Sequence, residues 1–214
     1  MEPALHDQSN DFDDPVVFVI DDDPDVREGL RVLFESVNLR SRSFRSAQEF
    51  LGTQILPDQV SCLILDVRLP GLSGLDFQAN VQIDIPIIFI TGHGDIPMSV
   101  RAMKAGAVEF LTKPVREQDV LDAVEIALNR DRERRHRKEG AHDLRSRFDS
   151  LSQRERQVMT LVTAGMMNKQ VAAELGITEV TVKVHRHNVM KKLYARSFTD
   201  LVRMADAVGL PRTI

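Results

Sequence analysis

Acidic, hydroxyl and ammonium side chains directly follow four short apolar runs in the first half of the chain. These side chains are Asp21, Asp22 and Asp23 after residues 16–20, Asp66 after 62–65, Thr91 after 86–90, and Thr112 and Lys113 after 108–111. The runs have the composition of strands, and the carboxyl ends of parallel strands meet at one edge of a sheet, where ligands bind. The sequence therefore predicts one site that combines carboxylates, a hydroxyl group and an ammonium group.

These groups together suit a phosphate-accepting metal site. Clustered carboxylates repel one another unless a cation joins them, and their hard oxygen atoms are ligands that suit Mg²⁺. Ammonium and hydroxyl groups can bind phosphoryl oxygens, and a carboxylate can act as a nucleophile that forms an aspartyl phosphate. Asp23 precedes Pro24, a pair typical of a helix start, so we assign Asp21 and Asp22 to the metal.

Five strand-like runs position these side chains, the weakest of them at residues 41–44. Three of the five are nearly continuous in apolar residues, as expected for parallel strands that helices cover on both faces. Segments of helical periodicity lie between the runs. This alternation predicts a doubly wound α/β domain over residues 16–128. The single cysteine, Cys62, lies in the third run and is expected to be a core residue.

The segments on either side of this domain are polar. Residues 1–15 are acidic and have no apolar stretch, so we expect a flexible leader and not a secretory signal. The run 130–140 contains no large apolar side chain. We therefore expect residues 129–150 to form an exposed linker whose helical part ends near Gly140. A basic run of this kind could also contact nucleic acid.

Residues 151–214 have the pattern of four short helices. Ser152 with Glu155 three residues later forms a capping box, and the other expected helix starts are Asn168, Thr178 and Ser197. The turn between the second and third of these helices contains a glycine, which is typical of a helix-turn-helix. This half is therefore predicted to be all-α.

The third of these helices has two distinct faces. Its core-facing stripe consists of Val182, Val189, Met190 and Leu193, and its opposite face carries Val180, Lys183, Val184, His187 and Lys191. Lysines can meet phosphates or guanine, and valine can touch the methyl group of thymine, so the exposed face suits the major groove of DNA. Two lysines on a helix are also common on an ordinary solvated surface, and this alternative stays open.

The net charge of −4 averages two opposite halves. Residues 1–128 carry 10 basic and 22 acidic residues, whereas residues 129–214 carry 18 basic and 10 acidic residues. A basic second half indicates a nucleic-acid partner. A membrane-spanning helix needs about 20 consecutive apolar residues, and no stretch of the sequence comes close to that length. We expect a cytoplasmic protein with no membrane partner.

Several motifs of the first half resemble the receiver domain of two-component response regulators. They lie at residues 20–23, 65–70, 90–95 and 113–114, together with Gly74. The resemblance covers residues 16–128 and implies a five-stranded sheet of order 2-1-3-4-5. It further implies that Asp66 accepts the phosphoryl group, and that Asp22, Asp66 and the main-chain carbonyl of Arg68 hold Mg²⁺ while Asp21 assists through water.

The same resemblance implies a switch beside the acceptor. Lys113 would pair with the phosphoryl group, and Thr91 would bond to it after phosphorylation. Phe110 occupies the position of an aromatic residue that turns inward when this threonine moves. The Lys113–Pro114 bond resembles a junction that is often cis in the family.

The second half resembles the LuxR-type DNA-binding domain over residues 151–210, on motifs at residues 151–156, 165–169, 171–172 and 181–186. The resemblance implies that Lys183, Val184 and His187 face bases. Residues that it places near phosphates are Asn168, Lys169, Thr181 and Lys191. The two domains together are most similar to the FixJ branch of the FixJ/NarL response regulators.

This resemblance implies a transcriptional regulator that a sensor histidine kinase phosphorylates on Asp66. Phosphorylation would favour a homodimer on two half-sites of double-stranded promoter DNA, and the family implies recruitment of RNA polymerase and thus activation. Two alternatives are a DNA-binding regulator with a degenerate receiver and an aspartate-nucleophile phosphatase. The second is less favoured, because such enzymes usually have an aspartate two residues after the nucleophile, where this chain has Arg68.

Overall fold

The computed structural model describes residues 14–53, 59–81, 83–92 and 94–211. The chain divides into two compact units, Met1–Arg135 and His136–Ile214, which we call the N-terminal and C-terminal units. Of the expected leader, residues 1–13 lie outside the described residues, as does His93 of the motif 90–95. Among the described residues, no helix is long and apolar enough to cross a membrane.

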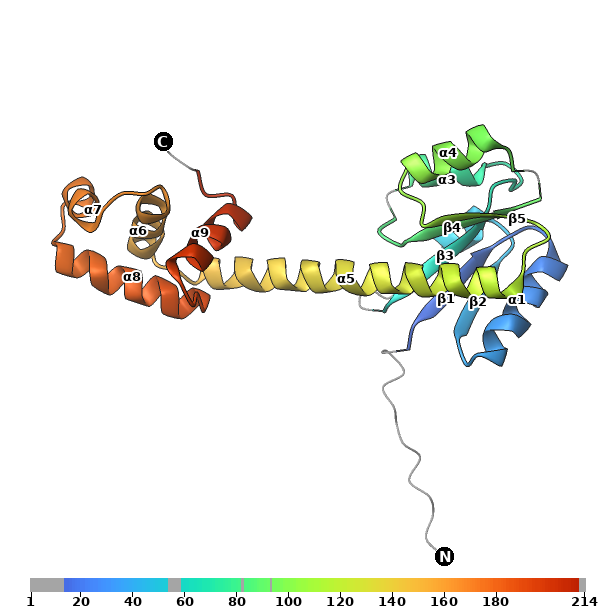
Figure 1. The fold of residues 1–214 in the computed structure, drawn as a ribbon, viewed down its shortest axis with the longest axis horizontal. Coiled ribbons are helices and arrows are strands. Elements are labelled where there is room, and N and C mark those ends of the chain that lie inside the picture. The colour runs from blue at the N-terminus through green and yellow to red at the C-terminus, as the bar shows by residue number, and fades with distance from the viewer. Residues whose placement is uncertain (1–13, 54–58, 82, 93, 212–214) are drawn as a thin grey trace, which may run out of the picture. The chain divides into compact units, whose positions relative to one another are not determined.

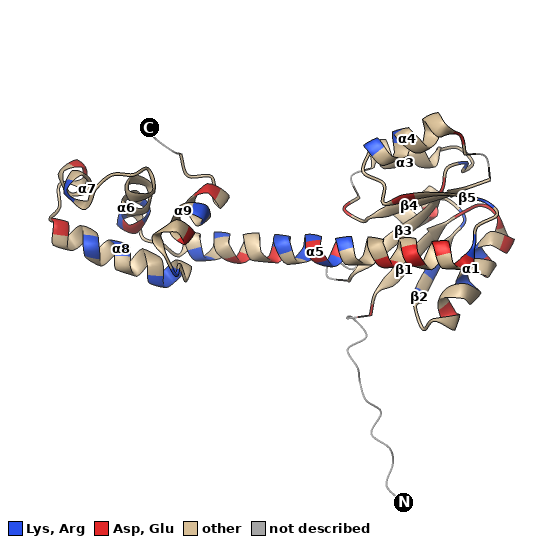
Figure 2. Ribbon diagram, in the orientation of Figure 1, with Lys and Arg blue, Asp and Glu red and all other residues tan. Residues whose placement is uncertain are grey.

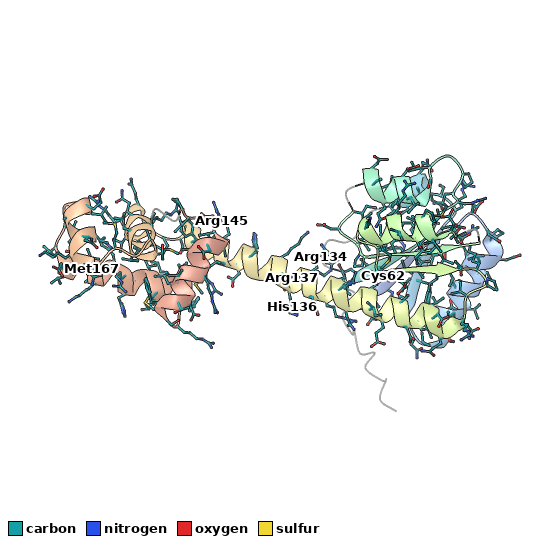
Figure 3. All side chains as sticks on the ribbon, turned by 45° about the horizontal axis from the view of Figure 1, so that its top comes forward. Cys62, Arg134, His136, Arg137, Arg145 and Met167 are labelled. Atoms are coloured by element: carbon teal, nitrogen blue, oxygen red, sulfur yellow. The ribbon has the colours of Figure 1, made fainter. Side chains whose placement is uncertain are left out.

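The N-terminal unit contains a parallel sheet of five strands in the order β2-β1-β3-β4-β5, which confirms the predicted fold (Figure 1). The strands are β1 (Val16–Ile20), β2 (Arg40–Phe44), β3 (Ser61–Asp66), β4 (Ile87–Thr91) and β5 (Glu109–Thr112). Every residue of β1, β3 and β4 is buried, because helices cover both faces of the sheet. Cys62 is fully buried within β3, as expected (Figure 3).

Two layers of helices cover the sheet. The helices of this unit are α1 (Pro24–Ser36), α2 (Ala47–Leu51), α3 (Gly74–Asn80), α4 (Ile96–Lys104) and the first part of α5 (Glu117–Asp149). On one face, aromatic residues from the strands pack against α2, α3 and α4, with Phe50 and Phe77 at the centre. On the other face, α1 and α5 pack on the sheet through Leu30, Phe34 and Val124. In parallel sheets covered by helices on both faces, ligand sites form at the carboxyl ends of the strands.

A buried carboxylate of helix α5 forms a hydrogen bond with the amino end of β3. Asp131 is 0% exposed, and its Oδ2 accepts a hydrogen bond of 3.0 Å from the main-chain N–H of Ser61. Its two oxygens also accept from Arg134 at 2.6 and 2.9 Å and from Arg135 at 2.6 Å. Arg134 in addition pairs with Asp84 at 3.5 Å. We call Asp131, Arg134 and Arg135 the α5 anchor; Figure 3 labels Arg134 on the helix.

Helix α5 continues through Gly140 to Asp149, whereas the sequence indicated an end near Gly140. One glycine inside a helix costs about 1 kcal/mol relative to alanine, and its neighbours include arginine, lysine, glutamate and alanine, which favour helices. Residues 136–143 are all exposed, and charged residues of both signs lie along this part of the helix (Figure 2). Leu144 and Phe148, further along α5, pack into the core of the C-terminal unit.

The C-terminal unit contains the four predicted helices after the end of α5. They are α6 (Gln153–Thr163), α7 (Asn168–Leu175), α8 (Glu179–Leu193) and α9 (Phe198–Ala207). The expected capping box forms between Ser152 and Glu155, and Thr178 and Ser197 cap α8 and α9. Helix α7 ends at Leu175, and its cap is Gly176, whose φ of 64° lies in the left-handed region that favours glycine. The predicted fold class is therefore confirmed in both halves.

The start of α7 differs from the prediction in one respect. Asn168 is the first helical residue and not the cap, which is Met167. The side chain of Gln170 accepts a hydrogen bond from the main-chain N–H of Met167. Asn168 instead accepts a hydrogen bond from Arg186, 18 residues later, so its side-chain oxygen is used in tertiary contact.

Candidate metal centre and nucleic-acid interface

Three carboxylates meet at the carboxyl ends of β1 and β3. Oxygen atoms of Asp21, Asp22 and Asp66 lie within 4.8 Å of one another. Asp21 and Asp66 are only 2% and 6% exposed, whereas Asp22 is exposed to solvent. A set of hard oxygen donors with one side open to solvent fits a divalent cation that keeps some of its water, which is the usual binding mode of Mg²⁺. These residues therefore suit the expected cofactor.

Lys113 joins the two buried carboxylates. Its Nζ lies 2.7 Å from Oδ2 of Asp21 and 3.0 Å from Oδ2 of Asp66. Burial raises the pKa of Asp21, and hydrogen bonding to Lys113 offsets this only in part. Burial acts to lower the pKa of Lys113, but its hydrogen bonds to Asp21 and Asp66 outweigh that effect and raise it. Lys113 is thus a protonated ammonium at neutral pH, placed where it can meet a phosphoryl group.

Main-chain hydrogen bonds fix the orientation of both buried carboxylates. Oδ1 of Asp66 accepts from the N–H of Arg68 at 2.9 Å, and Oδ1 of Asp21 accepts from the N–H of Asp23 at 3.0 Å. Asp23 itself caps α1 ahead of Pro24, as the sequence predicted. One oxygen of Asp66 is therefore held by the backbone, while the other faces Lys113. An oriented carboxylate beside a cation is the arrangement that a phosphoryl acceptor requires.

Gly74 allows α3 to begin against the end of β3. Its N–H donates to the carbonyl of Val67 at 2.9 Å. A Cβ atom at this position would lie 2.3 Å from the carbonyl oxygen of Asp66 and 3.1 Å from Cα of Val67. Both neighbours are backbone atoms, which cannot rotate away. Glycine is therefore required for this close approach to the backbone of Asp66.

We expect Gly74→Ala to destabilise the N-terminal unit by about 2 kcal/mol, because the added methyl group must displace the backbone at Asp66. It should also slow phosphorylation of the chain by acetyl phosphate. Far-UV circular dichroism during urea unfolding and phosphorylation measured on Phos-tag gels provide the two readouts. Gly29→Ala is the control, since a Cβ atom there meets nothing within 4 Å. Equal phosphorylation rates for Gly74→Ala and wild type would contradict the prediction.

Thr91 and Phe110 lie on neighbouring strands and share one face of the sheet. Thr91 ends β4 and is 0% exposed, and its main-chain oxygen accepts from the N–H of Lys113 at 2.8 Å. Phe110 is the register partner of Phe89, two residues before Thr91, so the alternation of strands places all three side chains on the same face. The half-buried ring of Phe110 packs near Phe89 and beside Gly94, where a Cβ atom would lie 2.8 Å from the ring.

Helix α8 has the two faces that the sequence predicted. Val182, Val189 and Leu193 are fully buried, and Met190 packs against them. The side chains of the opposite face are exposed: Val180 at 69%, Val184 at 53%, and Lys183, His187 and Lys191. Lys169 at the start of α7 is also exposed, while Asn168 and Thr181 are partly buried. Exposed apolar and basic side chains on one helix face form a surface that can enter a major groove.

A buried carboxylate connects α6 to the end of α8. Glu155 is 5% exposed, and its Oε2 accepts from Nζ of Lys192 at 2.7 Å and from the N–H of Ser152 at 2.8 Å. Burial acts to raise the pKa of Glu155, but these hydrogen bonds outweigh burial and hold the pKa below its usual range. The capping box of α6 therefore also positions α8.

This lowered pKa predicts a pH-dependent loss of stability in the C-terminal unit. Because the pKa of Glu155 is lower in the folded state than in the unfolded state, its contribution is present above the unfolded value of about 4.3 and is lost as the pH falls through the folded value. We expect Glu155→Gln to lower the free energy of unfolding by about 1 kcal/mol at pH 7 and by progressively less in acid.

Tyr194 provides the measurement, because the chain has one tyrosine and no tryptophan, and this tyrosine lies directly after α8. Its fluorescence during urea unfolding reports on the C-terminal unit. Glu174→Gln, an exposed glutamate on α7, is the control and should have little effect. A stability difference between Glu155→Gln and wild type that does not shrink in acid would contradict the assignment.

The structure brings Asp21, Asp22 and Asp66 together with Lys113 at the carboxyl ends of the strands. Thr91 ends β4, Phe110 lies two residues before the end of β5, and the predicted nucleic-acid residues lie on α7 and α8. Sequence reasoning missed two residues with tertiary roles. Asp131 follows the buried residues Ala127 and Leu128 at helical spacing, and this spacing indicates the core-facing side of α5. Its charge, however, indicated an exposed position. Arg186 likewise follows buried Val182 by four residues.

Comparison with known protein families finds one matching family within each of the two units. Residues 17–125 match the family described as "Response regulator receiver domain", and residues 149–205 match the family described as "Bacterial regulatory proteins, luxR family". The first match contains the acidic site, and the second contains α6, α7, α8 and most of α9.

Individual relatives match over nearly the whole chain. Nodulation protein W of Bradyrhizobium diazoefficiens is 58% identical over 198 residues, which are 91% of this chain and 87% of the relative. The transcriptional regulatory protein FixJ of Rhizobium meliloti is 42% identical over 200 residues, 92% of this chain and 97% of the relative. A solved structure of the response regulator StyR is 52% identical, with a TM-score of 0.77, and covers 90% of this chain and 98% of that chain.

Proposed function

The chain belongs to the response regulators that join a receiver domain to a LuxR-type DNA-binding domain, and we propose that a sensor histidine kinase phosphorylates it on Asp66 to activate transcription. The family is that of phosphorylation-dependent transcriptional regulators, and relatives named FixJ, at 42% identity, fit a regulator of the FixJ/NarL type. The receiver domain implies a kinase partner, and the LuxR-type domain implies DNA binding.

The observation that carries the proposal is the environment of Asp66. This carboxylate is buried, is oriented by the N–H of Arg68, and faces Lys113 at 3.0 Å, beside two further carboxylates. Mg²⁺ at this site would shield negative charge on the incoming phosphoryl group. Asp21, Asp22, Asp66 and the main-chain carbonyl of Arg68 are the proposed ligands. Thr91 and Lys113 would then bind the phosphoryl oxygens, and Phe110 would move into the space that Thr91 leaves.

We propose that this change promotes a homodimer whose two copies of α8 read two half-sites of promoter DNA. Lys183, Val184 and His187 would contact bases, and Asn168, Lys169, Thr181 and Lys191 would contact phosphates. The proposed partners further include RNA polymerase, and the proposed location is the cytoplasm. The proposed boundaries are a leader at 1–15, a receiver domain at 16–128, a linker at 129–150 and a DNA-binding domain at 151–214.

One experiment tests whether phosphorylation of Asp66 controls dimerisation and DNA binding. Duplexes that the phosphorylated wild-type chain selects from a random library serve as the probe. Their affinity and the mass of the chain in solution are measured with and without acetyl phosphate and Mg²⁺, for wild type and for Asp66→Asn. We expect tighter binding and a dimeric mass only for wild type with acetyl phosphate.

Equal binding in all four conditions would overturn the proposal and would favour a regulator that does not depend on phosphorylation. Repeated turnover of a phosphate ester by the isolated chain would instead favour a phosphatase. Lys183→Ala and His187→Ala are the matched controls for the DNA-binding half. Both should accept phosphate on Asp66 at the wild-type rate and bind the selected duplex at least tenfold more weakly, the loss expected for one base contact of about 1.4 kcal/mol.

A further inference from the structure

Arg186 connects the first turns of two other helices of the C-terminal unit. Its guanidinium donates a hydrogen bond of 2.7 Å to Oδ1 of Asn168, the first residue of α7. The guanidinium carbon also lies 5.5 Å from the ring centroid of Phe198, the first residue of α9. A single side chain of α8 therefore contacts the starts of both neighbouring helices.

Arg186 lies on the side of α8 that faces the core. It follows Val182 by four residues and precedes Val189 by three, and both of these valines are fully buried. The exposed face that suits a major groove, with Val184 and His187, lies on the other side of the helix. Arg186 is therefore not placed to read bases, although it belongs to the recognition helix.

The partner of Arg186 is a neutral amide. Among the described residues, no ion pair found in the structure includes Arg186, and its contacts are with Asn168 and the ring of Phe198. The carboxamide of asparagine is planar, with an oxygen that only accepts hydrogen bonds on one side and an NH₂ group that only donates them on the other. Because Arg186 engages the oxygen, the NH₂ group must face away from Arg186.

This orientation matters at the start of α7. In a helix-turn-helix, the first helix crosses the DNA backbone, and phosphate oxygens only accept hydrogen bonds. An outward NH₂ group of Asn168 can donate to a phosphate, next to exposed Lys169 and the positive end of the helix dipole. The reverse orientation would present an oxygen to the phosphate and would repel it.

We propose that Arg186 is a positioning residue for DNA binding, which holds the amide of Asn168 with its donor group directed at a phosphate. The proposal rests on DNA binding by the C-terminal unit and adds a residue that the resemblance did not assign. Arg186 acts through Asn168 and does not itself contact DNA. Its effect on affinity therefore depends on the presence of the asparagine.

Wild type and five variants test this dependence, in the full phosphorylated chain with the duplex selected by wild type as the probe. Position 186 is Arg, Lys or Met, and position 168 is Asn or Ala. With asparagine at 168, we expect Arg186→Met to bind about tenfold more weakly and Arg186→Lys to recover part of this loss, because lysine is also a donor. With alanine at 168, all three variants should bind equally.

Salt dependence separates positioning from a direct phosphate contact. If Arg186 neutralised a phosphate, Arg186→Met would reduce the slope of log affinity against log salt by about 0.9. We expect the slope to stay at the wild-type value. A reduced slope, or a further loss on Arg186→Met in the Asn168→Ala background, would overturn the proposal.

Asn168→Asp separates positioning of the amide from a purely structural connection between α7 and α8. Aspartate still accepts the hydrogen bond from Arg186, so the free energy of unfolding, followed by Tyr194 fluorescence, should not fall. Its outward oxygen would nevertheless face a phosphate, and we expect binding at least tenfold weaker than wild type. Wild-type affinity for Asn168→Asp would contradict the proposal. Failure of the wild-type chain itself to bind any duplex would contradict DNA binding as such.

Discussion

Asp131→Asn is expected to destabilise the N-terminal unit by about 3 kcal/mol, although position 131 is far along the chain from Asp66. The carboxylate is fully buried and neutralises Arg134 and Arg135, whose side chains are only 24% and 14% exposed. Asparagine has nearly the same shape, but it carries no charge to offset those of two largely buried guanidinium groups. Removing one partner of a buried ionic cluster costs far more than the cluster itself contributes.

Far-UV circular dichroism and Tyr194 fluorescence, recorded in the same urea titration, localise the effect. Tyr194 belongs to the C-terminal unit, so its transition should keep the wild-type midpoint while the dichroism transition of the N-terminal unit shifts to lower urea. Glu28→Ala is the matched control. It also removes a carboxylate that pairs with an arginine of the same helix, Arg31, but both side chains are largely exposed and such pairs contribute little.

The result also bears on the boundary between the two units. The residues of the α5 anchor were predicted to lie in an exposed linker at 129–150, yet Asp131 bonds to β3 and Arg134 pairs with the loop before β4. If the anchor is as strong as expected, amide hydrogen exchange in wild type should be slow up to about residue 135 and fast at residues 136–143. Unchanged stability of Asp131→Asn, with fast exchange from residue 129 onward, would support the boundary at 128.

The strands of the sheet and the helix starts were predictable because residues adjacent in the sequence specify them. Continuous apolar runs specify buried parallel strands, and Asp23–Pro24, Ser152–Glu155 and Thr178 specify helix starts through their own backbone neighbours. The residues of the acidic site were predictable for a related reason. Each follows a strand directly, and parallel strands bring their carboxyl ends together whatever the connecting helices do.

The interactions that escaped prediction all pair residues distant in sequence. Asp131 meets Ser61 across 70 positions, and Arg186 meets Asn168 across 18. In each case a polar residue occupies a core-facing helical position, and periodicity alone assigns such a position to an apolar side chain. Gly74 belonged to a recognised motif, but only the structure shows that the carbonyl of Asp66 excludes a methyl group there.

Lys113→Met is the second substitution for which we expect a large effect, on Mg²⁺ binding and on the response to phosphorylation. In wild type the ammonium lies within 3.0 Å of Asp21 and Asp66, where it repels a second cation. Two unit charges 4 Å apart interact by about 4 kcal/mol at an effective dielectric constant of 20. We therefore expect methionine to strengthen Mg²⁺ binding by about tenfold or more, which corresponds to about 1.4 kcal/mol.

The metal-free variant should also acquire a distinctive pH dependence. Burial already raises the pKa of Asp21, and loss of the hydrogen bond from Lys113 raises it further. A carboxylate whose pKa is higher in the folded state stabilises the fold below its unfolded pKa of about 3.9 and loses that contribution as the pH rises through the folded value. We therefore expect the stability of metal-free Lys113→Met to fall more steeply from pH 4 to 7 than that of wild type, and saturating Mg²⁺ to restore it.

Phosphorylation separates the two roles of the lysine. Asp21, Asp22 and Asp66 all remain in Lys113→Met, so acetyl phosphate should still modify the chain, but the phosphoryl group would lack its ammonium partner beside Thr91. We expect the phosphorylated variant to bind the selected duplex no more tightly than the unphosphorylated one. Lys104→Met, which removes an exposed lysine at the end of α4, should behave as wild type in every measurement. Unchanged Mg²⁺ affinity, or a full response to phosphorylation, would show that Lys113 neither competes with the metal nor transmits the signal.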